Sequence, residues 1–192
     1  MKKSFILSAA AALTLLVSCG TSADITSIGQ PDPALTGTWV SRHETNDKNG
    51  KREHYDRVSF FSDGTFAQYG YIKMEMKESG TPAHIEISFQ GSGKYGVTND
   101  NINFCFSPSD RTAKLDRFDV STDKTLSAHQ AGATKFILKS VLIKPLIKDM
   151  RKSMKEGQIY HIDSITPSAL DMTDLKDEEH KSETYFKQNG NE

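Results

Sequence analysis

The chain has 192 residues, with 24 Lys or Arg side chains against 25 Asp or Glu, so its formal net charge at pH 7 is −1. This length suits one domain with a short extension. Loss of an amino-terminal leader that contains Lys2 and Lys3 would change the balance from 24:25 to 22:25, a net charge of −3. Both values exclude a general nucleic-acid binder, because such proteins carry a strongly basic surface.

The amino terminus has the pattern of a secretory signal. Lys2 and Lys3 precede an apolar run over residues 5–17, which is shorter than the roughly 20 residues of a membrane-spanning helix. The run ends in Leu16-Val17-Ser18-Cys19, which resembles the lipobox of bacterial lipoproteins. The resemblance implies cleavage before Cys19 and acyl chains, such as palmitate, on its sulfur and its new amine. The alternative is an ordinary signal peptide with a chance cysteine at this position.

Residues 19–34 are small, polar and interrupted by Pro31 and Pro33. Such a segment cannot bury enough apolar surface to order itself. We therefore predict a flexible tether that its two prolines stiffen next to the domain. The predicted organisation is a signal peptide over 1–18, the tether over 19–34, a barrel domain over 35–188 and a frayed tail over 189–192.

The body of the chain begins with Gly37-Thr38-Trp39, which contains the only tryptophan. A tryptophan at the start of the first strand can plug the floor of an antiparallel barrel, and the glycine lets the backbone pass close beneath it. We therefore expect Trp39 to be buried at the base of a barrel.

A series of short strands follows. Over residues 65–77 apolar Phe66, Ile72 and Met74 share one parity, and Tyr69 and Tyr71 share the other, which is the signature of a half-buried strand. Turn signals at Asn49-Gly50, Asp63-Gly64 and Gly91-Ser92-Gly93 separate the strands that we expect over 36–44, 53–61, 65–77, 84–90, 94–97, 101–106 and 114–121. This spacing predicts an antiparallel meander that closes as a barrel.

The strand pattern fails over residues 123–143, and a helix is predicted after it. Pro145 and Gly157 bracket residues 146–156, since proline is favoured at the first helical position and glycine just past the last. One side of this helix is apolar and carries Ile143, Ile147, Met150 and Met154. Another side is basic and carries Lys144, Lys148, Arg151, Lys152 and Lys155. The helix packs its apolar stripe on the barrel, closes the barrel mouth as a lid, or contacts anionic lipid or an acidic partner.

Strands resume over 158–165, 169–175 and 183–187. The motif around Trp39 is thus followed, in order, by Val58–Phe66, Gly93–Val97 and Ile162–Met172. This ordered set resembles the lipocalin-like domain family of bacterial, Bacteroidetes-type lipoproteins, over roughly residues 35–187. The resemblance implies an all-β, antiparallel up-and-down lipocalin-like (calycin) barrel, with one amphipathic helix inserted before the last strands. It also implies a last strand that pairs with the first, and a binding role. About eight strands close a barrel just wide enough for one small ligand or for side chains alone.

No catalytic or metal-binding motif is visible. The six histidines form no His-x-His or His-Glu-x-x-His pair: they are His43, His54, His84, His129, His161 and His180. Gly91-Ser92-Gly93-Lys94 is read as a hairpin turn and not as a phosphate loop, because no helix follows it. We therefore expect no enzyme activity, no cofactor and no metal.

Three tyrosines and one cysteine remain to be assigned a role. Tyr69, Tyr71 and Tyr95 could offer hydroxyls to a ligand, although aromatic residues on barrel strands mostly pack. If Cys19 is acylated, an intramolecular disulfide is excluded, and Cys105, between Phe104 and Phe106, is expected to act as a small buried hydrophobic side chain. The alternative for Cys105 is a reactive thiol.

The sequence therefore predicts a monomeric cell-envelope lipoprotein, anchored through Cys19 to the outer membrane, whose barrel binds a small apolar or amphipathic ligand. The alternative is a structural or interaction lipoprotein with a filled barrel that contacts another envelope component. The sequence assigns no ligand-binding residue.

Overall fold

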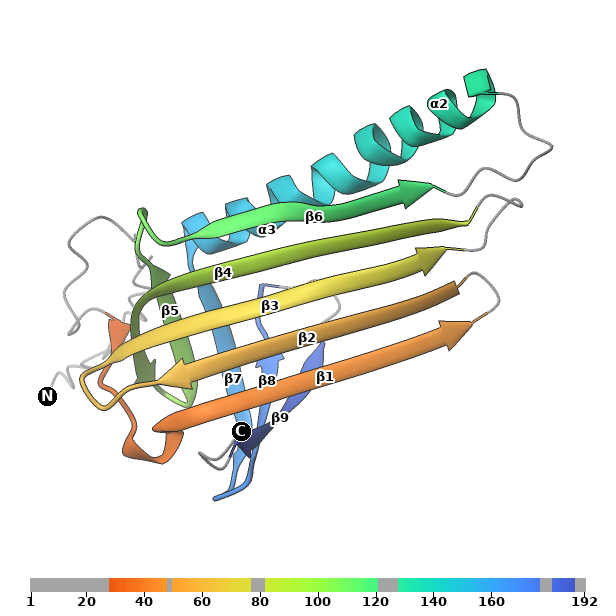
Figure 1. The fold of residues 1–192 in the computed structure, drawn as a ribbon. Helices are drawn as coiled ribbons and strands as arrows, with labels where there is room; N and C mark the ends of the chain where they lie inside the picture. Colours follow the sequence, from red (N-terminus) through yellow and green to blue (C-terminus); the bar gives the residue numbers. More distant parts are fainter. Residues whose placement is uncertain (1–27, 48–49, 77–81, 121–127, 177–180, 189–192) are drawn as a thin grey trace, which may run out of the picture.

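A computed structural model describes residues 28–47, 50–76, 82–120, 128–176 and 181–188 (Figure 1). In chain order the elements are η1 (Pro33–Leu35), β1 (Gly37–Asp47), β2 (Gly50–Phe60), β3 (Thr65–Met76), β4 (Ala83–Thr98), β5 (Asn101–Phe106), β6 (Thr112–Val120), α2 (Ala128–Ile137), η3 (Leu138–Ile143), α3 (Lys144–Glu156), β7 (Gln158–Ile165), β8 (Ala169–Asp174) and β9 (Ser182–Gln188). No helix in these ranges is long and apolar enough to span a membrane.

Eight of the nine strands close into an antiparallel barrel in the order β3-β2-β1-β9-β8-β7-β5-β4, and β4 pairs back onto β3. The ninth strand, β6, pairs with β4 outside this ring. The last strand returns to the first, with Thr38 of β1 opposite Gln188 of β9. The predicted fold class, an antiparallel barrel of about eight strands with a helix before the last strands, is confirmed.

Strand β4 is a single strand of 16 residues, so the turn predicted at Gly91–Gly93 is wrong. The glycines mark a change of neighbour instead: β4 pairs with β6 up to Gln90 and with β5 from Gly93 onward. A Cβ at residue 93 would overlap the Cys105 carbonyl, and one at residue 91 would meet the Phe106 ring. Glycine inside a strand here permits close approach and does not end the strand.

The barrel domain begins earlier than the predicted boundary at residue 35. Ile28 is fully buried, Gln30 exchanges two backbone hydrogen bonds with Val97 of β4, and Asp32 caps the short helix η1. Residues 28–34 are therefore part of the folded domain and not of a flexible tether. The rest of the predicted tether, with the signal peptide and the tail, lies outside the described residues.

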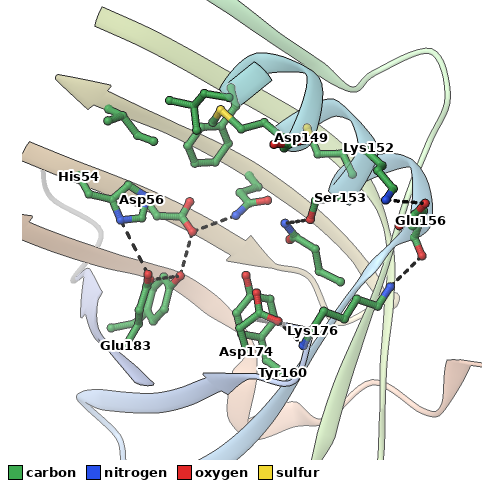
Figure 2. Close-up of a pocket in the computed structure, with 18 residues that line it drawn as sticks. His54, Asp56, Asp149, Lys152, Ser153, Glu156, Tyr160, Asp174, Lys176 and Glu183 are labelled. Atoms are coloured by element: carbon green, nitrogen blue, oxygen red, sulfur yellow. Dashed lines mark hydrogen bonds and ion pairs between the residues drawn. The ribbon is translucent and has the colours of Figure 1, made fainter. Parts of the chain in front are cut away.

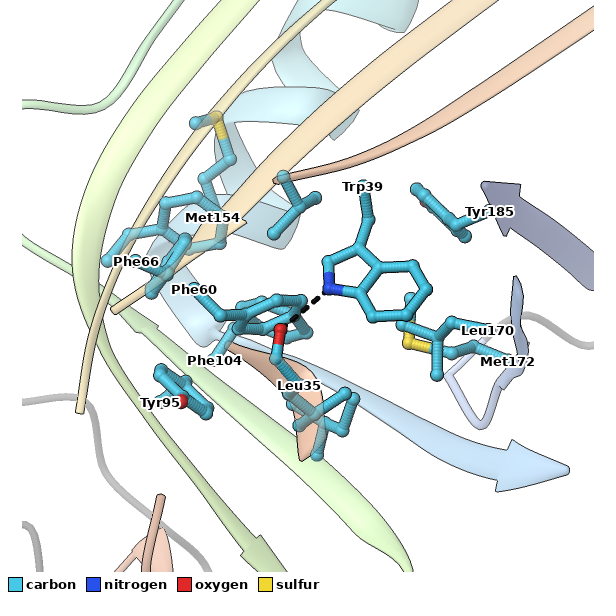
Figure 3. Close-up of a cluster of buried hydrophobic side chains, with 13 residues drawn as sticks. Leu35, Trp39, Phe60, Phe66, Tyr95, Phe104, Met154, Leu170, Met172 and Tyr185 are labelled. Carbon is cyan, nitrogen blue, oxygen red and sulfur yellow. Dashed lines mark hydrogen bonds between the residues drawn. The ribbon is translucent and has the colours of Figure 1, made fainter. Parts of the chain in front are cut away.

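The floor of the barrel is filled by a hydrophobic cluster around Trp39 (Figure 3). Trp39 is 0 % exposed, its indole Nε1 donates a hydrogen bond to the Leu35 carbonyl at 2.6 Å, and Lys187 Nζ lies 5.0 Å from the ring centroid. Beneath and beside it pack Phe60, Phe66, Phe104, Phe106, Leu170 and Met172. The expected burial of Trp39 at the barrel base is confirmed.

The helix is longer than the predicted residues 146–156. It runs through α2, η3 and α3, and η3 is a π-helical turn in which the Lys144 N–H donates to the Lys139 carbonyl. Proline has no N–H, and wider π turns commonly absorb such an interruption. Pro145 therefore lies inside a continuing helix, whereas Gly157 ends it, as predicted, with a positive φ of 75° that favours glycine.

The predicted apolar stripe of α3 faces the barrel. Ile143 of η3 and Met154 of α3 are buried, and Ile147 and Met150 pack against a second cluster formed with Ile85 and Ile87 of β4. In Figure 1 α3 runs along β6. Arg151 differs from the lysines on the basic side of the helix, because its guanidinium group contacts the sheet. Its Nε and Nη2 donate to the Ala113 carbonyl of β6 at 3.0 and 2.7 Å, which ties the helix to the outer edge of the sheet.

Candidate functional site

A cavity of about 580 Å³ lies above the filled floor, between α3 and the inner face of the barrel. This volume is within the range of small-molecule sites, roughly 300–1,000 Å³. One part of its wall is apolar and is formed by Ile72, Phe89, Leu146, Met150 and Met154. The barrel is therefore filled with side chains at its base and contains a cavity above them. The number of strands alone does not distinguish a filled barrel from one with a ligand cavity.

A glycine on β3 allows Phe89 to form part of this apolar wall. Gly70 of β3 lies directly opposite Phe89 of β4, and a Cβ at residue 70 would overlap the Phe89 ring and the Tyr55 carbonyl. Phe89 can therefore lie across β3, where it stacks on His54 with ring centroids 6.4 Å apart. Glycine at residue 70 therefore allows the Phe89 ring to lie against the backbone of β3.

The polar part of the cavity has two groups of residues (Figure 2). His54, Asp56 and Glu183 lie on one side, and Lys152, Glu156 and Lys176 lie on the other (Figure 2). The first group comes from β2 and β9, and the second from the end of α3 and the segment after β8.

Asp56 is the centre of the first group. It is 4 % exposed, and its Oδ2 accepts hydrogen bonds from Gln68 Nε2 at 2.9 Å and from the Tyr185 hydroxyl at 2.8 Å. Its other oxygen, Oδ1, has no hydrogen-bond partner within the described ranges. We define the acidic cluster as Asp56, Gln68, Glu183 and Tyr185.

The electrostatics of the acidic cluster favour a bound proton. Burial raises the pKa of Asp56 from 3.8 to about 6, although the hydrogen bonds from Gln68 and Tyr185 act in the opposite direction. Burial and the neighbouring carboxylates also raise the pKa of Tyr185 well above its usual value. The Tyr185 hydroxyl lies 2.8 Å from Asp56 Oδ2 and 3.1 Å from Glu183 Oε2, and it has only one proton to donate.

The second group is organised by the end of α3. Lys176 Nζ donates to the carbonyls of Glu156 and Gly157 at 3.1 and 2.6 Å, where the helix dipole favours a positive charge. Lys152 Nζ lies 3.9 Å from Glu156 Oε1. Gln158 donates to Ser153 Oγ at 3.2 Å, and its Oε1 accepts no hydrogen bond from the residues that the structure describes.

The tyrosines that the sequence offered as ligand contacts do not line the cavity. Tyr69 is exposed on the outer face, Tyr71 donates to Glu53 at 2.8 Å, and Tyr95 donates to the Phe61 carbonyl at 3.2 Å. Of the histidines, His54 lines the cavity. In the part of the chain described, no three His, Cys, Asp or Glu residues are arranged to hold a metal ion.

The structure describes one of the two cysteines. Cys19, the predicted lipidation site, lies outside the described residues. Cys105 is buried between Phe104 and Phe106, as expected, but it is disulfide-bonded. This differs from the expectation that followed from an acylated Cys19, and the partner sulfur lies outside the described ranges.

Sequence reasoning missed the acidic cluster, although β2 carries a signal for it. The inward positions of β2 are His54, Asp56, Val58 and Phe60, so a carboxylate stands at a core position of a half-buried strand. The neighbouring Tyr55 points the other way and stacks on Tyr71 outside the cavity, with ring centroids 5.0 Å apart. A charged residue in register with the apolar face was the available clue.

Comparison with known proteins gives no family: no protein-family model matches the chain, and no curated protein matches it.

Proposed function

We propose that this protein is a monomeric lipoprotein of the cell envelope, of the lipocalin-like type, whose barrel binds a small amphipathic molecule. The observation that carries the binding role is the 580 Å³ cavity, in which an apolar wall faces a buried carboxyl group, one oxygen of which has no hydrogen-bond partner among the described residues. Ligand sites commonly combine a mostly apolar lining with a few convergent polar groups.

The anchor is proposed from the sequence. Leu16-Val17-Ser18-Cys19 follows a basic and then an apolar leader, and it supports acylation of Cys19 and attachment to the outer membrane. Residues 28–34 fold onto the barrel, so the lipid would be connected to the domain through residues 19–27. The chain has two cysteines, so Cys19 can be acylated on its sulfur only in molecules in which it forms no disulfide with Cys105, and the proposed anchor belongs to that form.

Native mass spectrometry of the purified full chain tests the binding role. We expect a small molecule to co-purify and to be released on unfolding. Ser153→Phe, on the cavity side of α3, should reduce its occupancy by filling the space. Lys155→Phe is the matched control, since it adds the same ring to an exposed position of the same helix. Equal occupancy in the two variants, or no bound molecule in the wild type, would contradict the proposal.

A second candidate function, contact with another envelope component, is favoured by α2 and η3. Phe136, Ile137 and Val141 are 72, 56 and 72 % exposed, and the exposed Lys135 and Lys139 lie beside them. Exposed apolar side chains next to lysines suit the surface of an anionic membrane. Phe136→Ser with Val141→Ser should reduce sedimentation of the full chain with anionic vesicles and leave ligand occupancy unchanged.

A further inference from the structure

We infer that the ligand carries a cationic nitrogen head, such as a protonated amine, which binds the acidic cluster while its apolar body lies against Phe89 and α3. This inference rests on the proposed binding role and specifies the chemical class of the ligand.

The hydrogen bonds within the acidic cluster leave one acceptor of Asp56, its Oδ1 atom, without a donor among the described residues. Both neutral donors, Gln68 Nε2 and the Tyr185 hydroxyl, are directed at Asp56 Oδ2, so Oδ1 lacks a donor in the described part of the protein. A buried carboxyl oxygen without a partner is unfavourable, and a ligand N–H directed at it relieves that penalty. A charged N–H donor gives a shorter and stronger hydrogen bond than a neutral one.

The cluster carries more negative than positive charge. Glu183 Oε2 lies beside the Tyr185 hydroxyl, and Glu183 Oε1 is 3.8 Å from His54 Nδ1. The lysines of the cavity are directed elsewhere, because Lys176 binds the carbonyls at the end of α3 and Lys152 lies near Glu156. Among the described residues His54 is the cationic partner within ion-pair distance of this cluster, and it is neutral when unprotonated.

A ligand cation would substitute for a proton. Two carboxyl groups converge on one tyrosine hydroxyl proton, so an extra proton on the cluster relieves the repulsion between them. A cationic head placed there provides the same neutralisation at higher pH. The other titratable and charged groups that face the cavity are Asp149, Lys152 and Glu156 of α3, Tyr160 of β7, and Asp174 and Lys176 at the end of β8.

The same arrangement disfavours a fatty acid. A carboxylate head next to Asp56 and Glu183 would add a third negative group beside a carboxyl group that is only 4 % exposed, and like charges repel more strongly where water is largely excluded. The apolar wall of Ile72, Phe89 and Met150 accepts the tail of either molecule, so the head group alone decides between them. The cavity is therefore expected to separate amphiphiles by the sign of their charge.

Three soluble probes with one six-carbon tail test this: hexylamine, hexanol and hexanoate, titrated calorimetrically into the full chain at pH 7.5. We expect hexylamine to bind about 10- to 100-fold more tightly than hexanol, the range that a buried charged hydrogen bond gives. Hexanoate should bind more weakly than hexanol. Affinity for hexylamine should fall at pH 5, where Asp56 is protonated, and affinity for hexanol should not.

Asp56→Asn should remove the preference for the amine together with its pH dependence. Asp171→Asn is the matched control: Asp171 also accepts hydrogen bonds from two side chains, Ser164 and Thr184, but it lies on β8 outside the cavity. The pH series on the wild type keeps the test valid if Asp56→Asn folds poorly. Equal binding of amine and alcohol, or preference for hexanoate, would overturn the inference and leave the binding role standing. Failure of all three probes to bind would overturn both.

Discussion

The Tyr185 hydroxyl of the last strand donates to Asp56 Oδ2 of the second strand at 2.8 Å, across a sequence separation of 129 residues. The two strands are not neighbours: β1 lies between them in the ring, and its buried Ser41 stands directly opposite Asp56. The hydrogen bond therefore passes over β1 on the inner face of the barrel, immediately above the cluster around Trp39. A polar layer separates the packed floor from the cavity.

Asp56→Asn is expected to stabilise the protein at neutral pH. The pKa of Asp56 is raised from 3.8 to about 6 in the folded state, so between these values the folded state holds a proton that the unfolded chain has released. Stability due to this group therefore falls as pH rises from about 4 to about 6, by roughly 3 kcal/mol in total. Urea melts between pH 4 and pH 7.5 should show this loss in the wild type and a flatter profile in Asp56→Asn. Parallel profiles would show that Asp56 ionises normally.

Trp39→Ala should destabilise the barrel by about 3–5 kcal/mol, the usual cost of removing a large buried aromatic side chain. Trp39→Phe should cost less, because it keeps a ring in the cluster and loses the hydrogen bond to the Leu35 carbonyl. Denaturant melts of the two variants measure both values. A loss below about 1 kcal/mol for Trp39→Ala would mean that Trp39 does not organise the floor.

Arg151→Ala should loosen α3 from the edge of β6, because both of its hydrogen bonds to the Ala113 carbonyl are lost. Arg151 is solvent-exposed, so we expect a loss of only about 1 kcal/mol, below the usual range for charged hydrogen bonds. Hydrogen exchange of the amides of residues 146–156 should accelerate. Lys155→Ala removes an exposed cation from the same helix and serves as the control, and equal acceleration in both would rule out the Arg151 contact as the cause.

Met150→Asp distinguishes a lid from a structural brace. Met150 lines the cavity and packs on the cluster of Ile85 and Ile87, so a charge there should weaken the docking of α3. If α3 closes the cavity, hexylamine or a co-purified ligand should dissociate faster while the strand signal in circular dichroism is kept. Lower stability with unchanged dissociation would identify α3 as a brace alone.

Cys19→Ala should release the protein from the membrane fraction of the cells that make it. Several acyl chains together give stable anchoring, at about 0.8 kcal/mol per buried methylene, whereas one chain gives only marginal binding. Intact mass spectrometry of the wild type supplies the complementary result: acylation adds the mass of the lipid at Cys19, and a disulfide with Cys105 does not. A mutant that stays in the membrane fraction would contradict the anchor.

Alternation in single strands could be predicted from the sequence, but changes of partner could not. The inward parity of Phe66, Ile72 and Met74 follows from their own spacing, since side chains on a strand alternate between its faces. Gly91 and Gly93 give the same local signal as a turn, although their role depends on which strands lie beside β4. The long-range pairing of β6 with the first half of β4 leaves no mark within β4 itself.

The same distinction applies to the helix and to the site. The stripe of Ile143, Ile147, Met150 and Met154 is periodic and was predicted correctly, whereas Pro145 was mistaken for a helix start because the π turn before it has no simple sequence pattern. Asp56 and Tyr185 meet only when the barrel closes, because neither their spacing nor their neighbours relate them. Cavities of this kind result from closure and are not encoded in any one segment.

The chain leaves the barrel wall and returns to it at a single place. β5 and β7 are antiparallel neighbours, with Phe104 opposite Gln158, so everything between Phe106 and Gln158 departs from and comes back to one end of the same strand pair. A short hairpin could join the two strands with the ring intact. The register of β5 with β7 therefore does not fix the length of the segment between them, whereas β6 within that segment is fixed by its own pairing with β4.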